Sequence, residues 1–227
     1  MDSADILSRV ADRVIARQGH LHAHQRLRAS QTALVVIDMQ NYFCSPGFPA
    51  ENPRARGLVP AINAMASALR AASGQVVWVR TTSSGARERW ARHHMQMLTE
   101  ARAARRIATL DPSHAGYQIL EGLETHAADH FVDKIMYSAL IPGSSDLHAL
   151  LRQKGLDTLL IAGTATNVCC ESTARDAMML DYGVVMLADG TSASDEGVHR
   201  ATLEQFALYF GDVMTVAEAR ARLSVDP

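Results

Sequence analysis

The stretch TLLIAGTATNVCCESTARDAMMLDYGVVMLAD, residues 158–189, decides the fold class of this chain. It begins and ends with short, continuous apolar runs, at 158–164 and 183–189, of the kind expected of strands buried on both faces. Between them, a helical pattern runs from Val168 and stops before Gly183, and glycine commonly ends a helix. A strand, a helix and a second strand in succession predict two parallel strands joined by a crossover helix.

The same alternation extends over most of the chain. Apolar runs recur at residues 32–40, 75–82, 130–134 and 212–216, and helical patterns begin near residues 58, 145 and 197. We therefore predict an α/β fold with three α/β/α layers, in which helices cover both faces of a six-stranded, mainly parallel, doubly wound sheet. We assign residues 1–30 to an N-terminal helix and arm, and residues 31–227 to the α/β domain.

The N-terminal segment joins a helical pattern to a histidine-rich arm. Apolar residues recur at helical spacing between Ile6 and Val14, and the polar sequence HLHAHQRLRAS follows. His20, His22 and His24 could bind a metal ion, but their alternation better fits one face of a strand. No cluster of carboxylates or thiols accompanies them in the sequence, so metal binding is the less favoured interpretation.

Composition and charge argue against several classes of partner. The 227 residues carry a formal net charge of −2, so no basic excess favours nucleic acid. No apolar run approaches the roughly 20 residues that a membrane-spanning helix needs, and the N-terminus lacks the pattern of a secretory signal. Three cysteines do not suggest a disulfide framework and suit a reducing compartment. We expect a cytoplasmic protein that acts on a small molecule.

Reactive side chains stand at the ends of three predicted strands. In open α/β sheets, ligands bind beyond the carboxyl ends of the strands. Asp38, Lys134 and the pair Cys169 and Cys170 occupy such positions, and together they could form a nucleophile with its base and an electrostatic partner. The alternatives are cysteines that fill the core, an Asp38 bonded to nearby backbone and a surface Lys134. The only other lysine is Lys154, which favours a specific role for Lys134.

Cys169 is expected in the first turn of the helix that follows the fourth strand. There the helix dipole and free N–H groups lower the pKa of a thiol, and they can also hold the oxyanion of a tetrahedral intermediate. Successive helix residues point about 100° apart, so Cys170 is expected to turn into the core. A redox switch between the two cysteines remains an alternative.

Three segments carry a resemblance to a known family. ALVVIDMQNYF, DKIMYSAL and GTATNVCCESTARDA are similar, in order and spacing, to the three motif regions of the isochorismatase-like cysteine hydrolase superfamily. The resemblance implies that Asp38, Lys134 and Cys169 are the catalytic residues and that no cofactor is needed. It also implies a cis peptide between Thr164 and Ala165, which aims the N–H of Ala165, with that of Cys169, into an oxyanion hole.

The resemblance also narrows the reaction. Cys169 favours hydrolysis of a C–N bond in a small amide, ureide or carbamoyl compound, because isochorismatases cleave a vinyl ether and lack this cysteine. Nicotinamidases hold a metal through an Asp-x-His motif and a further histidine, whereas RTTSSGARERWARHHM offers only the adjacent His93 and His94, so we predict no metal. KIMYSAL and ATNVCCESTARDA are most similar to ureidoacrylate amidohydrolase-type members. A vinyl ether hydrolase and a noncatalytic or redox-sensing member remain alternatives.

Six residues are candidates for substrate binding, most of them with a structural alternative. They are Gln40, Trp78, Arg80, Trp90, Tyr137 and Asn167. For the tryptophans the alternative is packing in the core or as a surface anchor, and for the two amides it is a local hydrogen bond. Because members of the superfamily are commonly homo-oligomers, we also expect an oligomer, with the N-terminal helix and arm exchanged between subunits.

Overall fold

A computed structural model describes residues 3–225 of the chain. Its centre is a six-stranded sheet in which every neighbouring pair is parallel, in the order β4-β3-β2-β5-β6-β7. The strands are β2 (Thr32–Ile37), β3 (Gln75–Thr81), β4 (His130–Lys134), β5 (Thr158–Thr164), β6 (Gly183–Ser192) and β7 (Asp212–Met214). The prediction of a six-stranded, doubly wound α/β fold is confirmed.

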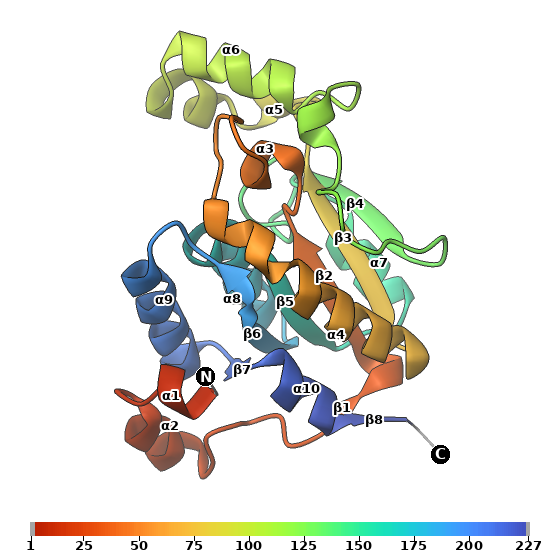
Figure 1. Cartoon of the computed structure of the whole chain (residues 1–227), viewed down its shortest axis with the longest axis vertical. Helices are drawn as coiled ribbons and strands as arrows, with labels where there is room; N and C mark the ends of the chain where they lie inside the picture. Colours follow the sequence, from red (N-terminus) through yellow and green to blue (C-terminus); the bar gives the residue numbers. More distant parts are fainter. Residues whose placement is uncertain (1–2, 226–227) are drawn as a thin grey trace.

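Helices cover both faces of this sheet (Figure 1). One core lies between the sheet and α4 with α10, and the other lies between the sheet and α7, α8 and α9. The helices are α1 (Ser3–Ile6), α2 (Ala11–Gln18), α3 (Asn41–Cys44), α4 (Val59–Ala71), α5 (Ala86–Arg89), α6 (Glu100–Thr109), α7 (Leu147–Gln153), α8 (Glu171–Met179), α9 (Glu196–Tyr209) and α10 (Val216–Arg222). None of the helices in residues 3–225 is long and apolar enough to cross a membrane.

Short turns of other helix types connect these elements. They are the 3₁₀ turns η1 (Ala29–Gln31), η2 (Pro53–Leu58) and η4 (Ala115–Tyr117) and the π turns η3 (His93–Met97) and η5 (Thr166–Cys170). Figure 1 shows α5 and α6 beyond α3, at the end of the molecule reached by the carboxyl ends of β2 and β3. The segment between β3 and β4 therefore lies over the edge at which ligands bind in this class of fold.

The N-terminal segment packs on the body of the same chain. Ile6, Leu7, Val10 and Val14 are buried in the core on the α9 side of the sheet. The following arm leads to β1 (Leu27–Arg28), which pairs in parallel with β8 (Leu223–Ser224). Exchange of this segment between subunits stays a prediction.

The histidine-rich arm is not a strand between residues 20 and 26, so the expected strand face was wrong. A distant carboxylate holds it instead, because His22 Nδ1 lies 3.0 Å from Asp212 Oδ1 and the backbone N–H of His24 donates to Asp212 Oδ2 at 3.0 Å. Burial alone would raise the pKa of Asp212, but the hydrogen bonds from His22 and His24 outweigh it and lower that pKa to about 2. Sequence proximity could not reveal this partner, which begins β7.

Acid should loosen this attachment. The folded-state pKa of Asp212 lies below the ordinary value of 3.8, so the ionised form stabilises the fold above about pH 4, and this contribution disappears as the pH falls towards 2. We expect Asp212→Asn to remove about 2 kcal/mol of the pH-dependent free energy of unfolding between pH 5 and pH 2. Urea unfolding across this range checks it, with the exposed Asp12→Asn as control. Identical pH profiles for Asp212→Asn and wild type would contradict this interpretation.

Candidate active site

The topological switch point of the sheet lies between β2 and β5. β2 leads directly into Asp38, whose φ of 55° is uncommon outside glycine, and whose backbone N–H donates to Val79 O at 2.9 Å. Next to it, Gly163 of β5 approaches β2 so closely that a Cβ would meet Ile37 O at 2.0 Å. Only glycine fits there, and the resulting close approach brings the loop after β5 alongside Asp38.

Two fully buried charged side chains meet at this point. Lys134 Nζ lies 2.9 Å from Asp38 Oδ2, and the side chains are 1% and 0% exposed. Thr81 bridges the pair, since its hydroxyl donates to Asp38 Oδ1 at 2.8 Å and accepts from Lys134 Nζ at 2.8 Å. The third donor of the ammonium reaches Met136 O at 3.0 Å. Three acceptors therefore satisfy the buried cation, and two donors satisfy the buried carboxylate.

These contacts fix the charge of Lys134. Burial opposes the ammonium form, but the Coulomb effects of Asp38 and Cys169 and the hydrogen bond to Asp38 keep the pKa of Lys134 above its ordinary value. The lysine is therefore a permanent cation at neutral pH, in contact with the carboxylate.

Cys169 adjoins this pair. It lies in the π turn η5, two residues before the regular helix α8 begins at Glu171, and it is 6% exposed. Burial, the charge of Asp38 and a hydrogen bond to Asp38 raise the pKa of the Cys169 thiol to about 12, against the lowering effect of Lys134. The expectation that a helix N-terminus lowers this pKa was wrong, because desolvation and the neighbouring carboxylate dominate. The resting group is therefore a protonated thiol next to the carboxylate of Asp38.

The loop between β5 and η5 presents backbone groups beside Cys169. The peptide bond joining Thr164 to Ala165 is cis. Within residues 3–225 the N–H of Ala165 has no acceptor. Side chains brace the loop on both sides: Asn52 Nδ2 donates to Thr164 Oγ1 at 2.9 Å, and Thr166 Oγ1 lies 2.8 Å from His199 Nδ1. The unpaired N–H of Ala165 is thus free to receive an anion.

Cys170 turns away from this site, as expected for the next helical position. It is fully buried, and its thiol lies 3.9 Å from Ala162 O. Burial, followed by the neighbouring Cys169 and Asp38, raises its pKa well above the ordinary value. All three cysteines of the chain are free in the structure.

Three of the six residues predicted to bind substrate form hydrogen bonds within the protein. Trp78 is 0% exposed in the core on the α4 side, and its Nε1 donates to Asp129 Oδ2 at 2.8 Å. Arg80 lies on the same strand face, where its Nε donates to Asp133 Oδ1 at 2.9 Å. Trp78 is fully buried, so its predicted role in substrate binding was wrong. Successive strand residues alternate between faces, and Thr81 is the β3 side chain at the ion pair, so the role of Arg80 stays a prediction.

Gln40 was also wrongly placed among the substrate contacts. It is fully buried, and its Nε2 donates to Thr81 O at 3.0 Å and to Tyr117 O at 2.8 Å, while its Oε1 accepts from Thr81 N–H at 2.7 Å. Both donors of the amide are thus used by backbone, and Gln40 holds the end of β3 in position.

Trp90 and Tyr137 do come together, although they are 47 positions apart. Their ring centroids are 4.8 Å apart in an edge-to-face arrangement, and Trp90 also stacks on His93 at 3.8 Å. Burial raises the pKa of Tyr137, opposed by Arg106 and reinforced by Cys169, so Tyr137 lies within electrostatic reach of the thiol. Asn167 is exposed at the start of η5.

Three residues of the site, which are Thr81, His93 and Arg106, were not predicted from the sequence. Thr81 ends the second sheet strand, so the strand-end rule that selected Asp38 would also have selected it. Arg106 lies in the helix α6, where no sequence signal separates it from its arginine neighbours. Among the residues that the structure describes, no group of three or more histidine, cysteine, aspartate or glutamate side chains is arranged to hold a metal ion.

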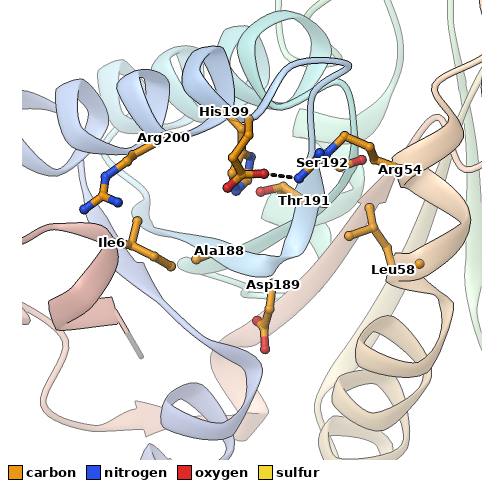
Figure 2. Close-up of a pocket in the computed structure, with 11 residues that line it drawn as sticks. Ile6, Arg54, Leu58, Ala188, Asp189, Thr191, Ser192, His199 and Arg200 are labelled. Atoms are coloured by element: carbon orange, nitrogen blue, oxygen red, sulfur yellow. Dashed lines mark hydrogen bonds and ion pairs between the residues drawn. The ribbon is translucent and has the colours of Figure 1, made fainter. Parts of the chain in front are cut away.

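A separate pocket of about 530 Å³ lies beyond the carboxyl end of β6 (Figure 2). Figure 2 shows Arg54 and Arg200 at opposite sides of it, with His199 between them. Arg54 pairs with Glu196, and Arg200 with Glu204. Asp38, Lys134 and Cys169 are not among its lining residues, so this pocket is distinct from the cluster around the thiol.

Comparison with known proteins agrees with this arrangement. Residues 32–218 match the isochorismatase domain. The chain belongs to the isochorismatase family. Relatives named ureidoacrylate amidohydrolase RutB include one from Pseudomonas syringae pv. syringae, 33% identical with 84% of this chain and 83% of that protein covered, and one from Variovorax paradoxus, 32% identical with 84% and 80% covered. These relatives support amidohydrolase activity in general for this isochorismatase-family hydrolase.

Solved structures give the same family. A cysteine hydrolase from Pseudomonas syringae pv. phaseolicola matches with a TM-score of 0.76 and 30% identity, covering 86% of this chain and 93% of that one. The fold and the motif resemblance predicted from the sequence are thereby confirmed.

Proposed function

We propose that this isochorismatase-family protein hydrolyses a C–N bond in a small amide, ureide or carbamoyl compound, with Cys169 as nucleophile. The observation that carries the proposal is the buried Cys169 thiol within electrostatic reach of Asp38, whose carboxylate is itself oriented by Lys134 and Thr81. A nucleophile beside a base, with the base held by further groups, is the arrangement that activates a weak nucleophile for covalent catalysis.

Acylation begins with transfer of the thiol proton to Asp38. Because the pKa of Cys169 is raised, the thiol is protonated in the resting enzyme and loses its proton only as the sulfur attacks the carbonyl carbon. Asp38 therefore acts as a general base in this step. The N–H groups of Ala165 and Cys169 receive the oxyanion of the tetrahedral intermediate. Asp38 then gives its proton to the departing nitrogen, the C–N bond breaks, and a thioester remains on Cys169.

Deacylation uses the same carboxylate. Asp38, now ionised again, takes a proton from a water molecule that attacks the thioester, and the oxyanion returns to the same two N–H groups. Collapse of this second intermediate breaks the C–S bond, returns the proton to the sulfur and releases the acid. Lys134 stays protonated in every step, so the carboxylate of Asp38 has a counter-ion whenever it is ionised in this buried site.

The names of the relatives favour ureides among the candidate substrates. Relatives above 30% identity are named ureidoacrylate amidohydrolases. This likeness, together with the cysteine, favours the C–N bond over the vinyl ether that isochorismatases cleave.

A substrate panel tests the proposed reaction. We expect the purified protein to release ammonia from at least one ureide, carbamoyl compound, primary amide or lactam, in proportion to enzyme concentration. Pyruvate release from isochorismate, measured in parallel, tests the vinyl ether alternative. Silence on every C–N substrate, or turnover of isochorismate alone, would contradict the proposal.

A further inference from the structure

The segment between β3 and β4 brings an aromatic cluster towards Cys169. Trp90, His93 and Tyr137 pack ring against ring, with His93 and Tyr137 centroids 5.4 Å apart and the Trp90 and His93 rings 8° from parallel. Tyr137 follows Lys134 by three residues and lies in the field of Cys169. The three rings therefore form an aromatic wall of which Tyr137 is the member within electrostatic reach of the thiol.

His93 carries an unused polar atom within this wall. Its side chain is buried, with 6% of the residue exposed, and its Nδ1 has no hydrogen-bond partner among residues 3–225. Burial, with Arg106 and His94, lowers the pKa of His93 to about 4, so the ring is neutral at pH 7. A buried polar nitrogen without a hydrogen-bond partner destabilises a protein unless a ligand supplies the missing hydrogen bond. The stacking on Trp90 keeps the ring in one plane.

Arg106 supplies a positive charge on the same side. Ala103 and Arg106 of α6 and Leu110, which follows the helix, share one face. Ala103 and Leu110 are buried, and Arg106 between them is half-buried. Its guanidinium lies 5.5 Å from the centre of the Tyr42 ring. No aspartate or glutamate within residues 3–225 forms an ion pair with it.

Arg106 also lies within electrostatic reach of the reacting groups. Its charge acts on Cys169, Lys134, Tyr137 and His93 alike. Since Asp38 and Lys134 neutralise each other, Arg106 leaves the site with one uncompensated positive charge. Such a site attracts an anion.

We propose that Arg106 and His93 bind a carboxylate of the substrate, so that the substrate is a small acid that carries its ureido or amide group at the other end. The guanidinium donates two parallel hydrogen bonds to the carboxylate, and the Nδ1–H tautomer of His93 donates a third. Tyr137 contacts the part of the substrate that joins its carboxylate to its ureido or amide group. This inference rests on the proposed C–N hydrolysis and names the class of substrate.

Matched substrates and variants test the subsite by activity. The pair 3-ureidoacrylate and its methyl ester differ only in the charge that Arg106 would contact. For the acid, we expect Arg106→Gln to lower kcat/KM about 10-fold to 100-fold, mainly through KM, and for the ester we expect a much smaller loss. Arg102→Gln, at an exposed position of the same helix, should change neither. Equal losses for acid and ester, or no loss for either, would overturn the inference.

A binding measurement keeps the inference testable if no turnover is found. Titration calorimetry of Cys169→Ala with ureidoacetate, 3-ureidopropionate and 3-ureidoacrylate reports the subsite without chemistry. We expect at least one acid to bind and the same acid to lose about 10-fold or more in affinity when Arg106→Gln is added. His93→Phe, which keeps the stacking on Trp90, should lose several-fold. Binding of an acid without hydrolysis by wild type would retain the subsite and reject the proposed reaction, whereas no binding by any of the three acids would overturn the subsite.

Discussion

Replacement of Cys169 by alanine is expected to lower kcat/KM by about 10⁴-fold or more, to the level of background hydrolysis. Without the sulfur no thioester can form, and water would have to attack the substrate directly in a site where Asp38 is directed at the thiol. The loss should appear in kcat as well as in kcat/KM, because the missing bond forms only during the reaction. Ammonia release under single-turnover and steady-state conditions measures it.

Cys170 provides the matched control for this experiment. It is adjacent in sequence and also buried, but its side chain packs in the core, so Cys170→Ala should retain activity within a few-fold and lose some stability. Acid quenching during turnover should add the mass of the acyl group to the peptide that carries Cys169 in the wild type. Retained activity in Cys169→Ala, or loss confined to Cys170→Ala, would reject the assigned nucleophile.

Replacement of Lys134 by methionine is expected to lower the free energy of unfolding by about 3–5 kcal/mol and to abolish hydrolysis. Methionine fills a similar volume, but it leaves the carboxylate of Asp38 buried without its counter-ion, and the third acceptor, Met136 O, without its donor. Urea unfolding at neutral pH measures the loss. Lys154→Met is the control, because the only other lysine is exposed and its removal should change stability by no more than about 0.5 kcal/mol.

A double variant separates the two effects of Lys134. Asp38→Asn in the Lys134→Met background removes the uncompensated charge, and asparagine tolerates the positive φ of this position. The double variant should therefore recover most of the stability while remaining inactive. If Lys134→Met were as stable as wild type, buried Asp38 would not need its counter-ion. The ion pair between Asp38 and Lys134 would then contribute little to stability.

Much of this protein was readable from its sequence because the relevant patterns are local. Each strand is a short apolar run and each helix a periodic one, so the order of elements, the parallel sheet and the edge at which ligands bind follow from neighbours in the chain. Asp38, Lys134 and Cys169 stand at the ends of such runs, and strand ends can be found by inspection. The three motif regions then identify the family.

The contents of the site beyond these three residues were decided by tertiary structure. Thr81 and Trp78 lie on one strand, three positions apart, yet one bridges the buried ion pair and the other fills the opposite core. Which face a strand residue occupies depends on the register of the assembled sheet. Arg106 reaches the site only because α6 folds over it.

The sequence by itself thus determined the fold, the family and the positions of three reactive side chains. Only the tertiary structure decided which side chains surround them and in what protonation state the cysteine rests. The thiol illustrates the physical reason: a helix N-terminus lowers a cysteine pKa locally, but burial and a carboxylate from β2 raise that of Cys169 to about 12. Desolvation and Coulomb interactions depend on everything within several ångströms, and distant segments supply most of those atoms.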